Sequence, residues 1–257
     1  MHLLVPPLET VVAVWLRRAT PPGCGSVLDA HELARQAGLA DPRAVTAYGH
    51  LHTLARVVVG AVTGQPPGAV RFDRTCQQCG EQHGRPVVVG DPQLHVSLSR
   101  AGDRVALAVT RVAPVGVDIE ALAGADFEGF AGVALHPAER ASTESLVGDR
   151  LRRRAHAWVR KEAALKALGT GLAVDPTSFP APVPGVAATV LAGLPEVVVA
   201  DLAVGPGQAG AVALAGASQP VVVEVARLGS VGSGMPWSHW SSRPANGIPG
   251  AERCTCS

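Results

Sequence analysis

The chain has 257 residues, of which 47% are apolar and 17% charged, so it can bury one large core or two small ones. Its net charge of +1 excludes a nucleic-acid binder held by bulk charge, but not one with a local basic patch. Five cysteines, an odd number in so long a chain, argue against a disulfide framework and favour a reducing compartment.

The sequence predicts a cytoplasmic protein without a membrane span. The first 16 residues lack an early basic cluster and are interrupted by Pro6, Pro7 and Glu9, unlike a secretion signal. The longest uncharged run, between Asp201 and Glu224, contains prolines, glutamines and glycines. It therefore predicts two strands with a turn rather than a membrane helix.

In chain order, the pattern predicts a strand at 10–16 and a helix at 43–62 that ends at Gly64. Strands at 95–99 and 105–110 follow, joined by a hairpin turn, and then a strand at 115–120. A helical region at 137–168 precedes further strands within 196–225. This alternation predicts an α+β chain of two similar-sized lobes that meet near residue 112.

The predicted boundaries are an N-terminal lobe at 1–112, a C-terminal lobe at 113–228 and a disordered tail at 229–257. The tail is rich in Gly, Ser and Pro. Its Trp237, Trp240, Cys254 and Cys256 leave a docking motif or a thiol pair as the alternative.

The strand Val115-Gly-Val-Asp-Ile-Glu120 places two carboxylates, Asp118 and Glu120, on one face. Their Cα atoms would be roughly 6.5–7 Å apart. Two such carboxylates repel one another unless a cation lies between them, and an all-oxygen ligand set suits Mg²⁺. On the spacing alone, ordinary surface acids at a solvated strand end are the better explanation.

The helix around Trp158-Val-Arg-Lys-Glu-Ala-Ala-Leu-Lys166 contains Lys161 and Lys166, the only two lysines beside 20 arginines. Its periodicity places Glu162 and Lys166 within the apolar stripe and Arg160 opposite, toward solvent. Charges on a core-facing stripe are costly unless they are paired or bind something. A simple i,i+4 Glu–Lys pair is the alternative.

The segment Cys76-Gln-Gln-Cys79-Gly-Glu-Gln-His83-Gly-Arg-Pro86 has two interpretations. A Cys-x2-Cys pair with a nearby His begins many zinc sites, but no second ligand pair follows at a suitable spacing. We therefore interpret it as a rigid turn that presents Arg85 to an anion, since the forked guanidinium suits phosphate.

Taken together, these motifs resemble the Sfp-type 4′-phosphopantetheinyl transferases. That family has a Gly-Val-Asp-x-Glu strand and, some forty residues later, a Trp-x-x-Lys-Glu-Ala-x-x-Lys helix. Here they are Gly116-Val-Asp-Ile-Glu120 and the helix that ends at Lys166. Upstream, Gly84-Arg-Pro86 resembles the family's Gly-Lys/Arg-Pro segment, and Val96-Ser-Leu-Ser-Arg100 its Ser-x-Ser-His strand end, with Arg100 in place of His.

The resemblance implies two pseudo-symmetric α+β lobes, each a small antiparallel sheet with helices, and an active site in the cleft between them. It also implies transfer of 4′-phosphopantetheine from coenzyme A to a serine of an acyl or peptidyl carrier protein, with release of 3′,5′-ADP. Fatty acid, polyketide and nonribosomal peptide carriers are all compatible. The implied enzyme is a cytoplasmic monomer that binds neither membrane nor nucleic acid.

The implied roles map onto residues of this chain. Mg²⁺ is held by Asp118, Glu120 and Glu162. The phosphates are contacted by Lys161 and Lys166, and coenzyme A also by Arg85, Ser99 and Arg100. Glu162, or a metal-bound water, takes the serine proton. A basic run, Arg150 and Arg152 to Arg154, would attract an acidic carrier.

Two alternatives belong to other classes. One is a catalytically silent module that binds coenzyme A or a carrier protein, and the other is a small zinc-containing interaction protein. Release of 3′,5′-ADP in the presence of a carrier distinguishes the enzyme from the first, and metal analysis tests the second.

Overall fold

The computed structural model describes residues 7–9, 11–18, 27–76, 79–145, 147–181, 189–217, 222–228 and 251–254. These residues form two β-sheets and a set of helices, which confirms the predicted mixture of α and β structure. Within these ranges, every helix is too short or too polar to cross a membrane.

The larger sheet has seven strands in the order β11-β10-β1-β5-β4-β3-β2. Its pairs are antiparallel except for β1 and β10, which run parallel. The strands are β1 (Val11–Arg18), β2 (Phe72–Thr75), β3 (Gln82–Val88), β4 (His95–Ala101), β5 (Arg104–Thr110), β10 (Val222–Leu228) and β11 (Ala251–Cys254).

The smaller sheet is antiparallel, with four strands in the order β6-β9-β8-β7. The strands are β6 (Val115–Ala121), β7 (Thr189–Val190), β8 (Val197–Asp201) and β9 (Gln208–Ala215). The helices are α1 (Ala30–Ala37), α2 (Pro42–Thr63), α3 (Phe130–Ala134), α4 (Pro137–Glu144) and α5 (Arg150–Leu168).

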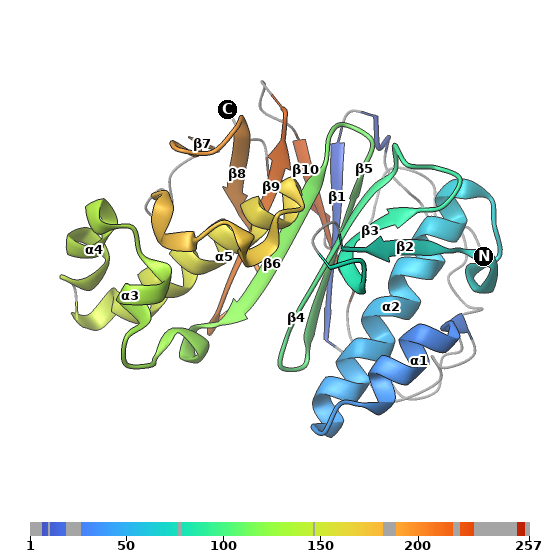
Figure 1. Cartoon of the computed structure of the whole chain (residues 1–257), viewed down its shortest axis with the longest axis horizontal. Helices are drawn as coiled ribbons and strands as arrows, with labels where there is room; N and C mark the ends of the chain where they lie inside the picture. Colours follow the sequence, from blue (N-terminus) through green and yellow to red (C-terminus); the bar gives the residue numbers. More distant parts are fainter. Residues whose placement is uncertain are drawn as a thin grey trace.

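The two sheets lie against each other between two helical layers (Figure 1). Because side chains alternate along a strand, the two faces of each buried strand pack into two different cores. In β5, Val105 and Leu107 pack with α2, while Ala106 and Ala108 pack against the smaller sheet. In the same way, Ala211 of β9 belongs to the core beneath α5.

Capping residues set the ends of the two long helices. Asp41 accepts a hydrogen bond from the backbone N–H of Arg43 at the start of α2, and Pro42 occupies the first turn. Gly64 ends α2 and Gly169 ends α5, both in the left-handed conformation that glycine tolerates best. The predicted helix end at Gly64 is therefore confirmed.

The junction between the sheets is made by β4 and the edge strand β6. The backbone N–H groups of Val117 and Ile119 point away from β9, so they need partners outside their own sheet. They donate to the hydroxyls of Ser97 and Ser99 on β4, at 2.9 and 3.1 Å. Two serines two residues apart thus match two edge amides two residues apart.

Gly116 allows α5 to lie directly on β6. A Cβ atom at this position would overlap the carbonyl oxygen of Ala163 and lie 2.6 Å from the amide nitrogen of Ala167. Both belong to the backbone of α5, which cannot move aside as a side chain can. The close approach brings the polar face of β6 up to the helix.

Most predicted elements are confirmed, with some differences. The helical region at 137–168 is broken into α4 and α5, and the sequence analysis did not identify α1, β2, β3 or α3. The run between Asp201 and Glu224 contains β9 and only the first residues of β10, and these two strands belong to different sheets. β10, which the predicted boundaries assign to the C-terminal lobe, pairs with the free edge of β1 in the larger sheet.

Residues 251–254 fall within the segment predicted to be a disordered tail. They form β11, which pairs antiparallel with β10, because β10 would otherwise leave an open edge of backbone donors and acceptors. Residues 229–250 and 255–257 lie outside the described residues, so the prediction is untested there.

We predict that Gly116→Ala lowers the free energy of unfolding by about 2–3 kcal/mol or more, because a methyl group there overlaps the backbone of α5. The matched control is Gly132→Ala in α3, where no atom lies within 4 Å of the added Cβ. Urea denaturation of both variants tests the prediction, and equal stability of the two would contradict it.

Candidate active site

Asp118 and Glu120 lie on the face of β6 that is turned toward α5. The alternate residues, Val117 and Ile119, pack into the core between the two sheets instead. Asp118 is buried, with 7% of its surface exposed, and Glu120 is half-buried. The prediction that these two carboxylates share one face of a strand is confirmed.

From the facing helix, Lys166 reaches the same place. Its ammonium donates to Oδ1 of Asp118 at 2.7 Å and to the carbonyl oxygen of Val117 at 3.1 Å. The hydroxyl of Ser99 donates to the same carboxylate oxygen at 2.7 Å. Asp118 is therefore held in one orientation by one group from α5 and another from β4.

Glu162 precedes Lys166 by one helical turn and belongs to the same cluster. Burial raises the pKa of its carboxyl, and the negative charge of Asp118 raises it further, while Lys166 opposes the shift. Burial also raises the pKa of Glu120; the backbone N–H of Ala121 opposes this shift, while Asp118 adds to it. The cluster thus holds three carboxylates and one ammonium, an excess of two negative charges.

This donor set fits a divalent cation in its chemistry. Carboxylate oxygens are the ligands that Mg²⁺ prefers, and a divalent ion would neutralise the two excess charges. Within the described residues, however, only Cys76, Cys79 and His83 bring donors from three metal-binding side chains within 4.8 Å of one another. A shared ion would therefore draw the carboxylates of Asp118, Glu120 and Glu162 closer together.

Lys161 does not join this cluster, which corrects its predicted placement beside the phosphates. Its ammonium is fully buried and pairs with Glu139 of α4 at 2.9 Å. It also donates to the carbonyl oxygens of Ala134 and Pro176, at 2.7 and 2.9 Å, and lies over the ring of Phe179. Lys161 therefore fastens α3, α4 and the turn at Pro176 to α5.

Arg160 is also placed differently from the prediction, since only 1% of its surface is exposed. Its guanidinium forms a bidentate pair with Asp201 of β8, with both distances 2.5 Å. Helical periodicity assigned Arg160 to the solvent face because it cannot show a carboxylate 41 residues away.

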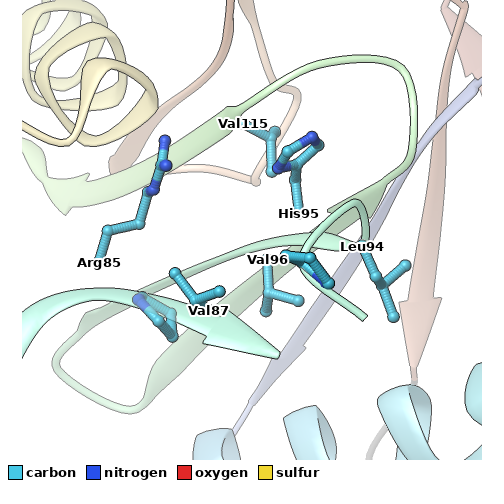
Figure 2. Close-up of a pocket in the computed structure, with 8 residues that line it drawn as sticks. Arg85, Val87, Leu94, His95, Val96 and Val115 are labelled. Carbon is cyan, nitrogen blue, oxygen red and sulfur yellow. The ribbon is translucent and has the colours of Figure 1, made fainter. Parts of the chain in front are cut away.

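Arg85 comes from β3, at a pocket beside the junction of the sheets. Figure 2 shows its side chain extending away from Val87 along one side of this pocket, which His95, Val96 and Val115 also line. One guanidinium nitrogen donates to the carbonyl oxygen of Ala167 at 2.9 Å, at the end of α5. The side chain is otherwise exposed, so its remaining donors face solvent.

The two other predicted coenzyme A contacts lie at the end of β4. Ser99 is buried, and its hydroxyl is engaged by Asp118 and the N–H of Ile119. Arg100 is exposed in the hairpin that joins β4 to β5. The structure thus brings Ser99, Asp118, Glu120, Glu162 and Lys166 together, with Arg85 and Arg100 at different points of the surrounding surface.

Sequence reasoning did not identify the role of Ser97 and Ser99 in joining the sheets. The signal was present as two serines that alternate with apolar residues in Val96-Ser-Leu-Ser99. Such residues satisfy the backbone of a neighbour when the strand lies against an open edge.

Comparison with known proteins bears on the same region. Residues 114–189, which include β6 and α5, match the family model of the 4′-phosphopantetheinyl transferase superfamily. The resemblance stated above is confirmed. A curated relative, the 4′-phosphopantetheinyl transferase psf-1 of Bacillus pumilus, is 34% identical over 110 residues. The alignment covers 39% of this chain and 43% of the relative, less than half of the transferase's length.

We predict that Glu162→Gln stabilises the protein at neutral pH without added divalent metal. The pKa of Glu162 is raised above its ordinary value of 4.5. The free energy of unfolding therefore falls as the pH rises from about 4.5 through the raised pKa, and this loss is complete above it. The amide avoids this loss, and the gain in stability should disappear below about pH 4.5, where the carboxyl is protonated in both states.

The control variant is Glu144→Gln, because the pKa of Glu144 is lowered by its hydrogen bonds to Arg154. This change should destabilise the protein at pH 7. Thermal melts of both variants between pH 4 and 8 test the signs, and a loss of stability in Glu162→Gln at pH 7 would refute the placement of Glu162 among like charges.

Proposed function

We propose that this chain is a Mg²⁺-dependent transferase that moves 4′-phosphopantetheine from coenzyme A to a serine of an acyl or peptidyl carrier protein. The observation that supports the proposal best is the cluster of Asp118, Glu120, Glu162 and Lys166 between β6 and α5. It lies wholly within the segment that matches the superfamily.

The proposed reaction exchanges one phosphorus–oxygen bond for another. The serine hydroxyl bonds to the phosphorus of the phosphopantetheine group, the bond to the second phosphate breaks, and 3′,5′-ADP departs with that bond's electrons. Such a transfer needs orientation and neutralisation of negative charge more than covalent help. A Mg²⁺ ion held by the three carboxylates would supply much of that neutralisation.

The residues of this chain fit the remaining roles. Glu162 has a raised pKa, and no hydrogen-bond donor from the described residues engages its carboxylate, so it is suited to accept the serine proton. Lys166 is suited to compensate charge on the departing phosphate. Ser99 and the backbone of β6 orient Asp118, which makes Ser99 a positioning residue.

We assign the nucleotide phosphates to Arg85 and Arg100, in a cleft between the two lobes that the resemblance implies. Arg85 combines an anchored guanidinium nitrogen with an exposed remainder, as a forked phosphate ligand requires. Arg100 is exposed beside Ser99. Lys161 is not included, because its ammonium is enclosed by Glu139 and two carbonyl oxygens.

The carrier protein would approach along the start of α5. Of the basic run that precedes the cluster, Arg153 pairs with Asp149 and Arg154 with Glu144. Arg152 is exposed and remains suited to meet an acidic helix of a carrier. We propose that the enzyme works as a cytoplasmic monomer on carriers of fatty acid, polyketide or nonribosomal peptide synthesis.

The decisive experiment combines the purified protein with coenzyme A, Mg²⁺ and several apo carrier proteins. We expect mass spectrometry to show phosphopantetheine on a carrier serine and chromatography to show an equal amount of 3′,5′-ADP. Glu162→Gln should reduce the rate at least about a hundredfold while keeping the fold. The exposed Glu128→Gln should match the parent protein.

If the protein binds coenzyme A but transfers nothing to a range of carriers, the proposed transferase activity is contradicted. It would favour a silent module that binds coenzyme A or a carrier protein. Calorimetric titration with coenzyme A, with and without Mg²⁺, distinguishes this outcome from a misfolded preparation.

A second prediction concerns whether a guanidinium can replace the compact ammonium of Lys166. Its ammonium lies near Asp118, the carbonyl of Val117 and, at 3.5 Å, the carbonyl of Leu98, so a planar guanidinium fits poorly. Lys166→Arg should therefore keep the charge but lower kcat at least about tenfold.

The control for Lys166→Arg is Arg43→Lys, at an exposed position of α2. Arg160→Lys is unsuitable as a control, because it would disturb the buried pair with Asp201. Since arginine pairs with a carboxylate as well as lysine does, undiminished kcat in Lys166→Arg would mean that Lys166 only holds Asp118.

A further inference from the structure

The turn between β2 and β3 brings two cysteines and a histidine together. The donor atoms of Cys76, Cys79 and His83 all lie within 4.8 Å of one another, and Sγ of Cys79 is 3.0 Å from Nε2 of His83. The two cysteines are not joined by a disulfide. The cluster belongs to a different hairpin from the carboxylates of β6 and has no part in the proposed transfer.

The backbone of the turn holds these side chains in place. The N–H of Gly80 donates to the carbonyl of Cys76, and the N–H of Cys76 donates to the carbonyl of Glu81, both at 2.8 Å. Gly80 has a φ of +78°, a left-handed conformation that strains other residues. The chain thus reverses tightly after Cys79, which returns His83 to the two sulfurs.

We propose that Cys76, Cys79 and His83 bind a Zn²⁺ ion through two thiolates and one imidazole. Sulfur and nitrogen donors of this kind select zinc over the hard cations that carboxylates bind. Three protein ligands leave a fourth tetrahedral position, which water or a group from outside the chain fills. Binding displaces the two thiol protons to solvent.

Cys254, the remaining cysteine among the described residues, does not supply a fourth ligand. Cys254 lies on β11, which is at the opposite edge of the seven-stranded sheet from β2 and β3. The sequence argued against zinc because no second ligand pair follows the two cysteines. A zinc site with three protein ligands and one open coordination position does not need a second pair.

The ion would stabilise the β2–β3 hairpin, which forms few regular pairs with the rest of the sheet. β3 pairs with β4 at a single position, Val87 with His95, and its pairing with β2 shifts register between Asp73 and Thr75. His83 lies two residues before Arg85, and Gly84 between them packs closely against the backbone of β2. A zinc clamp thus fixes the part of β3 from which Arg85 reaches α5.

Metal analysis of the full chain, purified without chelators, tests the proposal. We expect about one zinc per chain by mass spectrometry of the acidified protein. Replacement by Co²⁺ should give the near-ultraviolet absorption of thiolate-bound cobalt. Cys79→Ser and His83→Ala should each weaken zinc binding at least about tenfold, since even indirect supports of a metal site contribute that much. Cys254→Ser is the matched control and should retain zinc.

Measurements on the unaltered chain keep the proposal testable if those variants fail to fold. Removal of zinc by a chelator should lower Tm, and added Zn²⁺ should restore it. The proposal is overturned by a chain without zinc that shows no cobalt–thiolate absorption, by a disulfide between Cys76 and Cys79 that forms equally with and without Zn²⁺, or by loss of zinc in Cys254→Ser alone.

Discussion

The junction of the two sheets depends on how the open edge of β6 is satisfied. An edge strand buried without partners for its N–H groups would cost about 1–3 kcal/mol for each unsatisfied group. Ser97 and Ser99 supply acceptors at the required two-residue spacing. The hydroxyl of Ser99 also donates to Asp118, so the contact that joins the sheets orients the central carboxylate of the cluster.

The same junction explains why the cluster is polar in an otherwise apolar interior. Gly116 lets α5 approach β6, which places Glu162 and Lys166 opposite Asp118 and Glu120. Burial raises the pKa of both glutamates, and one lysine does not balance three carboxylates. A site that is electrostatically unfavourable by itself is suited to bind a cation, because part of the cost of assembling its charges is met during folding.

Local periodicity predicted each half of the cluster, and the family resemblance implied that the two halves meet. Alternation along β6 placed Asp118 with Glu120, and the helical repeat placed Glu162 with Lys166 on the side that faces the core. Periodicity failed for Arg160, and neither periodicity nor the resemblance indicated the buried pair of Lys161, because the partners Asp201 and Glu139 are distant in sequence. Spacing along one helix cannot reveal which distant residue pairs with a buried charge. Local patterns likewise cannot reveal that β10 pairs with β1.

The parallel pairing of β1 with β10 has a consequence for how the chain folds. Residues 11–17 pair with residues 222–228, so more than two hundred residues must be synthesised before the first strand obtains this neighbour. Contacts between such distant segments are slow to form because a long loop must close first. During translation β5 can pair with one edge of β1, but the edge that later meets β10 stays open, and a nascent chain of this protein depends on a chaperone to cover it.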